Sequence, residues 1–99
     1  MNDKQNIDWD NLGFNAHNTQ SMFIANWNPS DSKWDVTGLV PYGDISLSPA
    51  STVLNYGQGI FEGTKAHLSS KERVVFFRLK ENAKRFNSSS RRLCIPEIP

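Results

Sequence analysis

The sequence predicts an α+β fold in which an antiparallel sheet is flanked by helices. Two pairs of strand-like runs occur in chain order, within residues 21–40 and 65–78, and a segment with helical periodicity follows at 80–93. Strands joined by a short polar loop pair antiparallel, whereas parallel strands need a long crossover connection. We therefore expect hairpins and helices, and not a parallel βαβ unit.

The first hairpin is expected within residues 21–40. Ser21–Trp27 is an apolar run of strand length, and Trp34–Val40 is its weaker partner. Residues 28–32 (NPSDS) between them are a turn signal, because Pro fixes φ and Asn, Ser and Asp hydrogen-bond their own backbone. A further short strand is expected at Ile45–Leu47.

A short or broken helix is expected next, followed by a second hairpin. Ser48 and Pro49 resemble an N-cap and a first helical position, while the glycines at 57, 59 and 63 weaken a continuous helix. The runs Lys65–Leu68 and Val74–Arg78 are rich in branched and aromatic side chains, which favour strands. Residues 69–73 form the polar loop of this hairpin.

The last element is a helix over about Lys80–Leu93. Apolar or small residues recur at spacings of four, three, four and three, which places them on one helical face: Leu79, Ala83, Phe86, Ser90 and Leu93. Pro96 and Pro99 prevent the helix from continuing.

Length and composition limit the chain to one domain with an incomplete core. The chain has 99 residues, and its hydrophobic share of 37% is below that of a usual compact domain. We expect residues 1–18 to form an extended N-terminal arm and residues 19–99 to form a partial domain. An apolar face should then remain for further chain or for a partner.

Charge and cysteine content narrow the classes of function. Residues 51–99 hold nine Lys and Arg against four Glu, which indicates either an anionic partner or a solvated helix face. Cys94 is the single cysteine, so no internal disulfide forms, and we expect it to be a small buried residue. With two histidines, no metal site is expected. We also expect no membrane span and a cytoplasmic setting.

The glycines at 57, 59 and 63 do not form a nucleotide-binding motif. Their spacing is one residue too long for the dinucleotide fingerprint, and the Walker lysine is absent. They either permit turns and close packing or let a ligand approach the backbone. Glu62 and Lys65 in the same region are interpreted as a surface or hydrogen-bonding pair.

Arg85 is the main candidate for a binding residue. It precedes Phe86 by one position, about 100° from the apolar face, and its guanidinium fork matches the oxygens of a phosphate. The alternative is an ordinary surface arginine. Tyr56, Phe61 and Phe14 are candidates for an apolar pocket wall, although aromatic residues are more often part of a core.

Four motifs together resemble the N-terminal part of branched-chain amino acid aminotransferases, which are pyridoxal-phosphate enzymes of fold type IV. The motifs are Tyr56–Gly63 (YGQGIFEG), Phe77-Arg78, Asn82–Arg85 (NAKR) and Trp9–Phe14 (WDNLGF). The resemblance covers about residues 9–96. It departs at Gln20 and Ser21, where the family has Asp and then His or Tyr, and at Leu79, where the family commonly has Pro.

The resemblance implies the small N-terminal domain of that fold, incomplete in this chain, and a role for each candidate. Arg85 would bind the phosphate of the pyridoxal 5'-phosphate cofactor. Tyr56, Phe61 and, with a weaker match, Phe14 would line the substrate pocket. The family's Schiff-base lysine lies beyond Pro99, so no catalytic residue is assigned and the chain alone is expected to be inactive.

The implied reaction moves the amino group of leucine, isoleucine or valine to 2-oxoglutarate in a homodimeric enzyme. The alternative is a non-catalytic truncated homologue that binds a partner or is inert. Nucleic-acid binding through residues 78–92 ranks last, because this helix lacks interleaved aromatic residues for base stacking.

Overall fold

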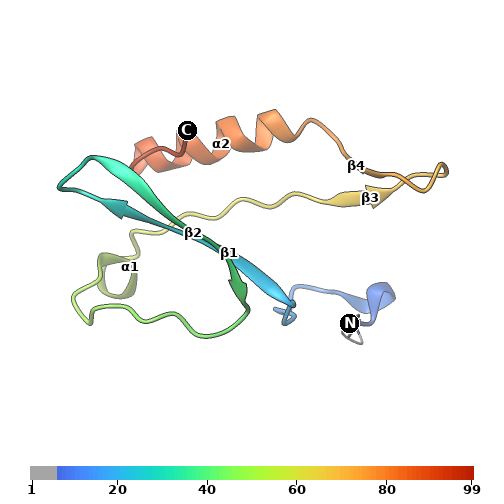
Figure 1. Ribbon diagram of the computed structural model, residues 1–99, viewed down its shortest axis with the longest axis horizontal. Helices are drawn as coiled ribbons and strands as arrows, with labels where there is room; N and C mark the ends of the chain where they lie inside the picture. The colour runs from blue at the N-terminus through green and yellow to red at the C-terminus, as the bar shows by residue number, and fades with distance from the viewer. Residues whose placement is uncertain (1–6) are drawn as a thin grey trace. The chain divides into compact units, whose positions relative to one another are not determined.

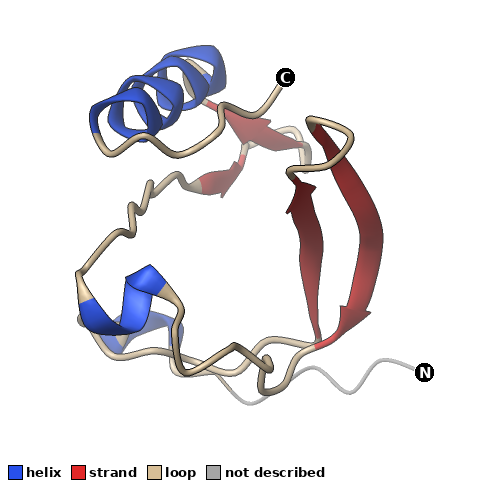
Figure 2. Ribbon diagram, turned by 90° about the vertical axis from the view of Figure 1, so that its left-hand side faces the viewer, coloured by secondary structure: helices blue, strands red, loops and turns tan. Residues whose placement is uncertain are grey.

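The computed structural model describes residues 7–99 and divides the chain into two compact units, Met1–Ser46 and Leu47–Pro99. The first unit contains a short 3₁₀ helix, Trp9–Asn11, and the strands β1 (Ser21–Asn28) and β2 (Lys33–Pro41). The second contains α1 (Thr52–Asn55), β3 (Ala66–Leu68), β4 (Val74–Phe76) and α2 (Leu79–Arg92). Figure 1 follows the elements along the chain, and Figure 2 distinguishes helices from strands. The expected α+β class is confirmed.

The strands β1 and β2 form an antiparallel hairpin, as predicted. The Asn28 side chain accepts a hydrogen bond from the Ser30 amide (3.0 Å), which is the turn chemistry indicated by the sequence. Next to the turn, the rings of Trp27 and Trp34 meet edge to face with centroids 5.5 Å apart. This aromatic pair lies across the two strands and stabilises the turn end of the hairpin.

The hairpin contains a β-bulge that the sequence pattern did not predict. Ile24 pairs with Gly38 and Ala25 pairs with Val36, so Thr37 is the extra residue. Gly38 has φ +92°, a conformation that side-chain-bearing residues rarely adopt. Opposite the bulge, Ile24 and Ala25 are both partly buried.

Two local predictions on the segment 45–50 are wrong. Ile45–Leu47 is not a strand, since it has no ladder partner, and residues 43–48 have no regular structure. Ser48 does not cap a helix, because its hydroxyl accepts the Ala50 amide (3.1 Å) inside a turn. The helix α1 begins later, at Thr52, and has four residues, which confirms the expected short helix.

The second hairpin and the final helix agree with the predictions to within one or two residues. The strands β3 and β4 pair antiparallel, and the Ser69 hydroxyl organises their loop by accepting the amides of Lys71 and Arg73. The helix α2 begins at Leu79, directly after Arg78 in the left-handed region at φ +51°.

The C-terminal end of α2 is a Schellman motif. The Ile95 amide donates to the Ser90 carbonyl (2.9 Å), and the Cys94 amide donates to the Arg91 carbonyl (3.2 Å). Cys94 takes the left-handed conformation that closes the motif, at φ +56°. The expectation that Cys94 is buried is wrong: the residue is exposed, because the capping turn lies outside the helical face that packs.

No hydrophobic residue among those described is fully buried, and the only buried residue is Ser90. On the predicted apolar face of α2, Phe86 is half-buried, whereas Leu79, Ala83 and Leu93 are exposed. The expectation of an incomplete core with an open apolar face agrees with this burial pattern.

Candidate functional site

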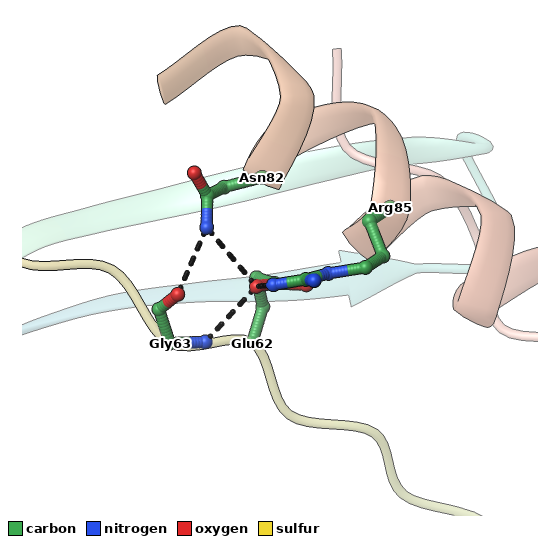
Figure 3. Close-up of polar contacts among 4 residues, drawn as sticks. All are labelled: Glu62, Gly63, Asn82 and Arg85. Carbon is green, nitrogen blue, oxygen red and sulfur yellow. Dashed lines mark hydrogen bonds and ion pairs between the residues drawn. The ribbon is translucent and has the colours of Figure 1, made fainter. Parts of the chain in front are cut away.

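A polar network joins the glycine-containing segment 57–63 to α2 (Figure 3). Asn82 and Arg85 lie three residues apart on α2, so their side chains leave the same side of the helix. Arg85 Nε donates to Glu62 Oε2 at 2.6 Å, and Arg85 Nη2 donates to Glu62 Oε1. Asn82 Nδ2 donates both to Glu62 Oε1 (3.2 Å) and to the Gly63 carbonyl (2.8 Å).

Glu62 is the centre of this network. Its carboxylate also accepts the Gly63 amide at 3.2 Å, and its side chain is only 12% exposed. The hydrogen bond from Arg85 is the main reason that the pKa of Glu62 falls to about 2, in opposition to partial desolvation, and Asn82 adds to the lowering. The same hydrogen bond raises the pKa of Arg85. Both groups are therefore charged at neutral pH.

Arg85 keeps donors for a second anion. Two of the five N–H groups of its guanidinium donate to Glu62, which leaves three, and the side chain is 68% exposed. It lines an open groove of about 750 Å³ along α2. The charged or hydroxyl-bearing residues of this groove are Arg78, Glu81, Lys84, Arg85, Ser88 and Arg91.

The charge of the groove favours an anionic ligand, because four cations face one carboxylate there. Besides Arg85, which pairs with Glu62, two of these cations have acidic partners: Lys84 pairs with Glu81 at 3.1 Å, and Arg91 pairs with Glu97. Arg85 differs from both, because its acidic partner is held in place by other residues and its free edge remains open.

The predicted aromatic residues are all exposed. Phe61 directly precedes Glu62 and is therefore close in the chain to the Arg85 network, with 93% of its surface exposed. Tyr56 follows α1 and is 85% exposed, and it takes no part in the network. Phe14 is fully exposed and belongs to the first unit. Their assignment to a substrate pocket stays a prediction.

The role of Glu62 was missed by reasoning from the sequence. The structure pairs Glu62 with Arg85 and not with Lys65, so that interpretation is corrected. The available signal was the Asn82–Arg85 spacing, which puts an amide and a guanidinium on one helix face where they suit a carboxylate. A second tie, from Gln58 Nε2 to the Leu93 carbonyl (2.7 Å), also joins the glycine-containing segment to the end of α2.

Residues 7–99 contain neither a membrane-spanning helix nor a cluster of metal-binding side chains. No helix in this range has the length and apolar character needed to cross a bilayer. Within the same range, no three His, Cys, Asp or Glu side chains gather in a way that could hold a metal ion.

Comparison with known proteins agrees with the motifs. No protein-family model matches the sequence. The chain is 42% identical over 90 residues to branched-chain-amino-acid aminotransferase 6 of Arabidopsis thaliana, covering 91% of the chain and 25% of that protein. It is 42% identical over 98 residues to the branched-chain-amino-acid aminotransferase of Helicobacter pylori, covering 99% of the chain and 28% of that protein. To branched-chain-amino-acid aminotransferase 2 of Bacillus subtilis it is 39% identical over 95 residues, covering 96% and 26%.

These matches show that the chain belongs to the aminotransferases. More particularly, over nine tenths of its length it is similar to the N-terminal portion of branched-chain-amino-acid aminotransferases, which confirms the resemblance predicted from the motifs. The chain spans about a quarter of the length of these relatives.

Proposed function

We propose that this chain supplies the N-terminal part of a pyridoxal-phosphate-dependent branched-chain aminotransferase. The observation that carries the proposal is the geometry of Arg85, whose guanidinium is held by Glu62 on one edge and keeps three N–H donors in a cationic groove. A dianionic phosphate ester matches such a donor set in charge and shape.

The residues of the chain fit the phosphate end of the cofactor. Arg85 would hold the phosphate, and Ser88, one helical turn later in the same groove, offers a hydroxyl donor. When bound, pyridoxal phosphate supplies the electron sink for amino-group transfer. We assign no residue of this chain to the pyridine ring of the cofactor. This agrees with a chain that matches a quarter of its relatives' length.

The aromatic residues would bind the substrate's aliphatic side chain. Phe61 and Tyr56 are exposed residues of the second unit, and Phe14 is an exposed residue of the first unit. Their rings are therefore available to a ligand. Flat apolar rings contact the branched side chain of leucine, isoleucine or valine favourably. The acceptor of the amino group would be 2-oxoglutarate.

The open apolar faces would be covered on assembly. We propose that the remaining three quarters of an aminotransferase polypeptide, and a second subunit of a homodimer, pack on residues that this chain leaves exposed. A cytoplasmic setting suits the single free thiol of Cys94.

Mutation of Arg85 tests the proposed function. The experiment uses a chimera in which this chain replaces the matching 98 residues of the Helicobacter pylori relative. In the chimera, Arg85→Ala should weaken pyridoxal 5'-phosphate binding by about tenfold to a hundredfold, because a charge-assisted contact of ~1.5–3 kcal/mol is lost. The affinity is measured by titrating the cofactor-free protein and following cofactor absorbance.

Arg92→Ala is the matched control, because Arg92 lies on the same helix but not among the residues that line the groove. Its cofactor affinity should equal that of the parent chimera. If Arg85→Ala binds the cofactor as tightly as Arg92→Ala does, Arg85 is not the phosphate anchor and the proposal fails.

The exposed apolar side chains also favour a second candidate, a non-catalytic homologue that docks on a full-length aminotransferase. Size-exclusion chromatography of the chain mixed with the Helicobacter pylori enzyme tests this candidate. Co-elution supports it, and separate elution at micromolar concentration argues against a partner role.

A further inference from the structure

Glu62 is held more firmly than the residue that it binds. Its carboxylate accepts four hydrogen bonds from Gly63, Asn82 and Arg85, and its side chain is 12% exposed. Asn82 is fixed in turn, because its amide also donates to the Gly63 carbonyl. The carboxylate therefore has one preferred orientation before any ligand arrives.

Arg85 would have many orientations without this partner. Its side chain is 68% exposed, and a long exposed side chain samples many rotamers. The two hydrogen bonds from Nε and Nη2 to Glu62 lie on one edge of a planar group. They set the direction of the opposite edge, which carries the remaining donors.

We propose that Glu62 is a positioning residue that fixes the free edge of Arg85 for a phosphate monoester, with Asn82 as the tether of Glu62. The inference rests on the proposed function, since it assigns how Arg85 is prepared for the phosphate of the cofactor. Holding a side chain in its binding conformation removes the entropy cost of ordering it when the ligand binds.

A positioning role and simple Coulomb attraction predict opposite changes in phosphate affinity when the charge of Glu62 is removed. A carboxylate beside Arg85 reduces the positive potential there, so removing its charge would strengthen phosphate binding if Coulomb attraction alone mattered. Under the positioning role, loss of the carboxylate weakens phosphate binding, because Arg85 must then be ordered by the ligand itself. The direction of the change therefore separates the two.

The test compares Glu62→Gln with Glu81→Gln in the chimera. Glu81 also lines the groove, but its carboxylate binds Lys84 and not Arg85. Glu62→Gln should weaken pyridoxal 5'-phosphate binding by about twofold to tenfold, which corresponds to ordering one long side chain. Glu81→Gln should strengthen that binding slightly, because it removes a negative charge from the groove without releasing Arg85. Asn82→Ala should act in the same direction as Glu62→Gln.

Pyridoxal without phosphate is the second probe, because it lacks the group that Arg85 would hold. Its affinity should be the same in Glu62→Gln and in the parent chimera. Tighter cofactor binding by Glu62→Gln, or equal weakening of both probes, would overturn the positioning role. If Arg85→Ala leaves cofactor binding unchanged, the proposed function itself fails; if Arg85→Ala weakens it and Glu62→Gln does not, only the positioning role fails.

A structural readout comes from the cofactor-free chimera, in which the apolar faces of this chain are covered. In a ¹⁵N-labelled sample, the Nε–H resonance of Arg85 should exchange slowly with water and stand apart from those of the other arginines, because it donates to Glu62 at 2.6 Å. Glu62→Gln and Asn82→Ala should speed this exchange, whereas Glu81→Gln should not. Rapid exchange of the Arg85 Nε–H in the parent chimera would contradict the proposed role.

Discussion

Glu62 accepts hydrogen bonds from two α2 residues that lie 20 and 23 positions further along the chain. The donors Asn82 and Arg85 are typical helix-surface residues, and neither spacing nor charge alone says which acid they meet. The pairing decides how Arg85 behaves, because an unpartnered exposed arginine is mobile whereas this one is held on one edge.

The pKa of Glu62 leads to a prediction on stability and pH. The pKa falls from 4.5 to about 2 on folding, so between these values the unfolded state binds more protons than the folded state. The contribution of Glu62 to stability should therefore be complete above about pH 5 and should be lost as the pH falls from 4.5 towards 2.

The measurement is the Tm of the chimera and of its Glu62→Gln variant from pH 7 down to pH 2. Other carboxylates titrate in both proteins, so the difference between the two Tm values isolates Glu62. This difference should be largest at neutral pH and should shrink as the solution becomes acidic. A difference that stays constant over the range would mean that Glu62 is not ion-paired in the folded protein.

Among the elements, the bulge in the first hairpin depends on Gly38. A Cβ at Gly38 would meet no atom within 4 Å, so the only obstacle to a side chain is the backbone at φ +92°. Gly38→Ala should therefore destabilise the chimera by ~1–2 kcal/mol, measured as a lower urea midpoint.

Gly43→Ala is the matched control for Gly38→Ala. A Cβ at Gly43 would also meet no atom within 4 Å, but the φ of this residue is not positive. Its substitution should change stability by only a few tenths of a kcal/mol, roughly the scale of ordinary surface changes. Equal effects of the two substitutions would show that the bulge does not need the left-handed conformation.

The C-terminal cap of α2 can be improved by a single substitution. Cys94 closes the Schellman motif at φ +56°, where glycine is the usual residue. Cys94→Gly should raise the free energy of unfolding by ~1 kcal/mol, because glycine takes this conformation without strain. Urea unfolding of the chimera measures the effect.

Cys94→Ala separates backbone strain from loss of the thiol. Alanine keeps the Cβ that causes the strain, so its stability should match that of the parent protein. If Cys94→Ala stabilises as much as Cys94→Gly does, the gain comes from removing the thiol and not from the cap.

For the whole molecule, the exposure of apolar side chains is the decisive feature. No hydrophobic side chain among residues 7–99 is fully buried. Large apolar side chains, Phe61 and Phe77 among them, are more than three-quarters exposed, which makes their surfaces suited to packing against more protein.

The isolated 99-residue chain should therefore bind a hydrophobic dye and show no transaminase turnover when pyridoxal 5'-phosphate is added. The chimera should bind much less dye, because the relative's remaining chain covers the apolar faces. Fluorescence of 8-anilinonaphthalene-1-sulfonate and an amino-transfer assay with leucine and 2-oxoglutarate measure the two properties. Turnover by the purified chain alone would refute the expectation that it is inactive.

Local patterns predicted the elements well where neighbouring residues decide the structure. Both hairpins and α2 were predicted to within two residues from alternation, turn residues and helical period. Ile45–Leu47 was predicted wrongly, since a strand exists only with a partner to pair with. For the candidate site, the binding role of Arg85 was predicted from its position and motif and stays a prediction, whereas the predicted pairing of Glu62 with Lys65 was wrong.

The sequence by itself determined the two hairpins, the final helix, the family resemblance and the excess of positive charge on α2, because each depends on residues close together in the chain. Only the tertiary structure decided that Glu62 holds Arg85, that Thr37 forms a bulge and that Cys94 is exposed in a cap. These features depend on which backbone and side-chain groups meet after folding, and residues that are neighbours in the sequence do not decide that.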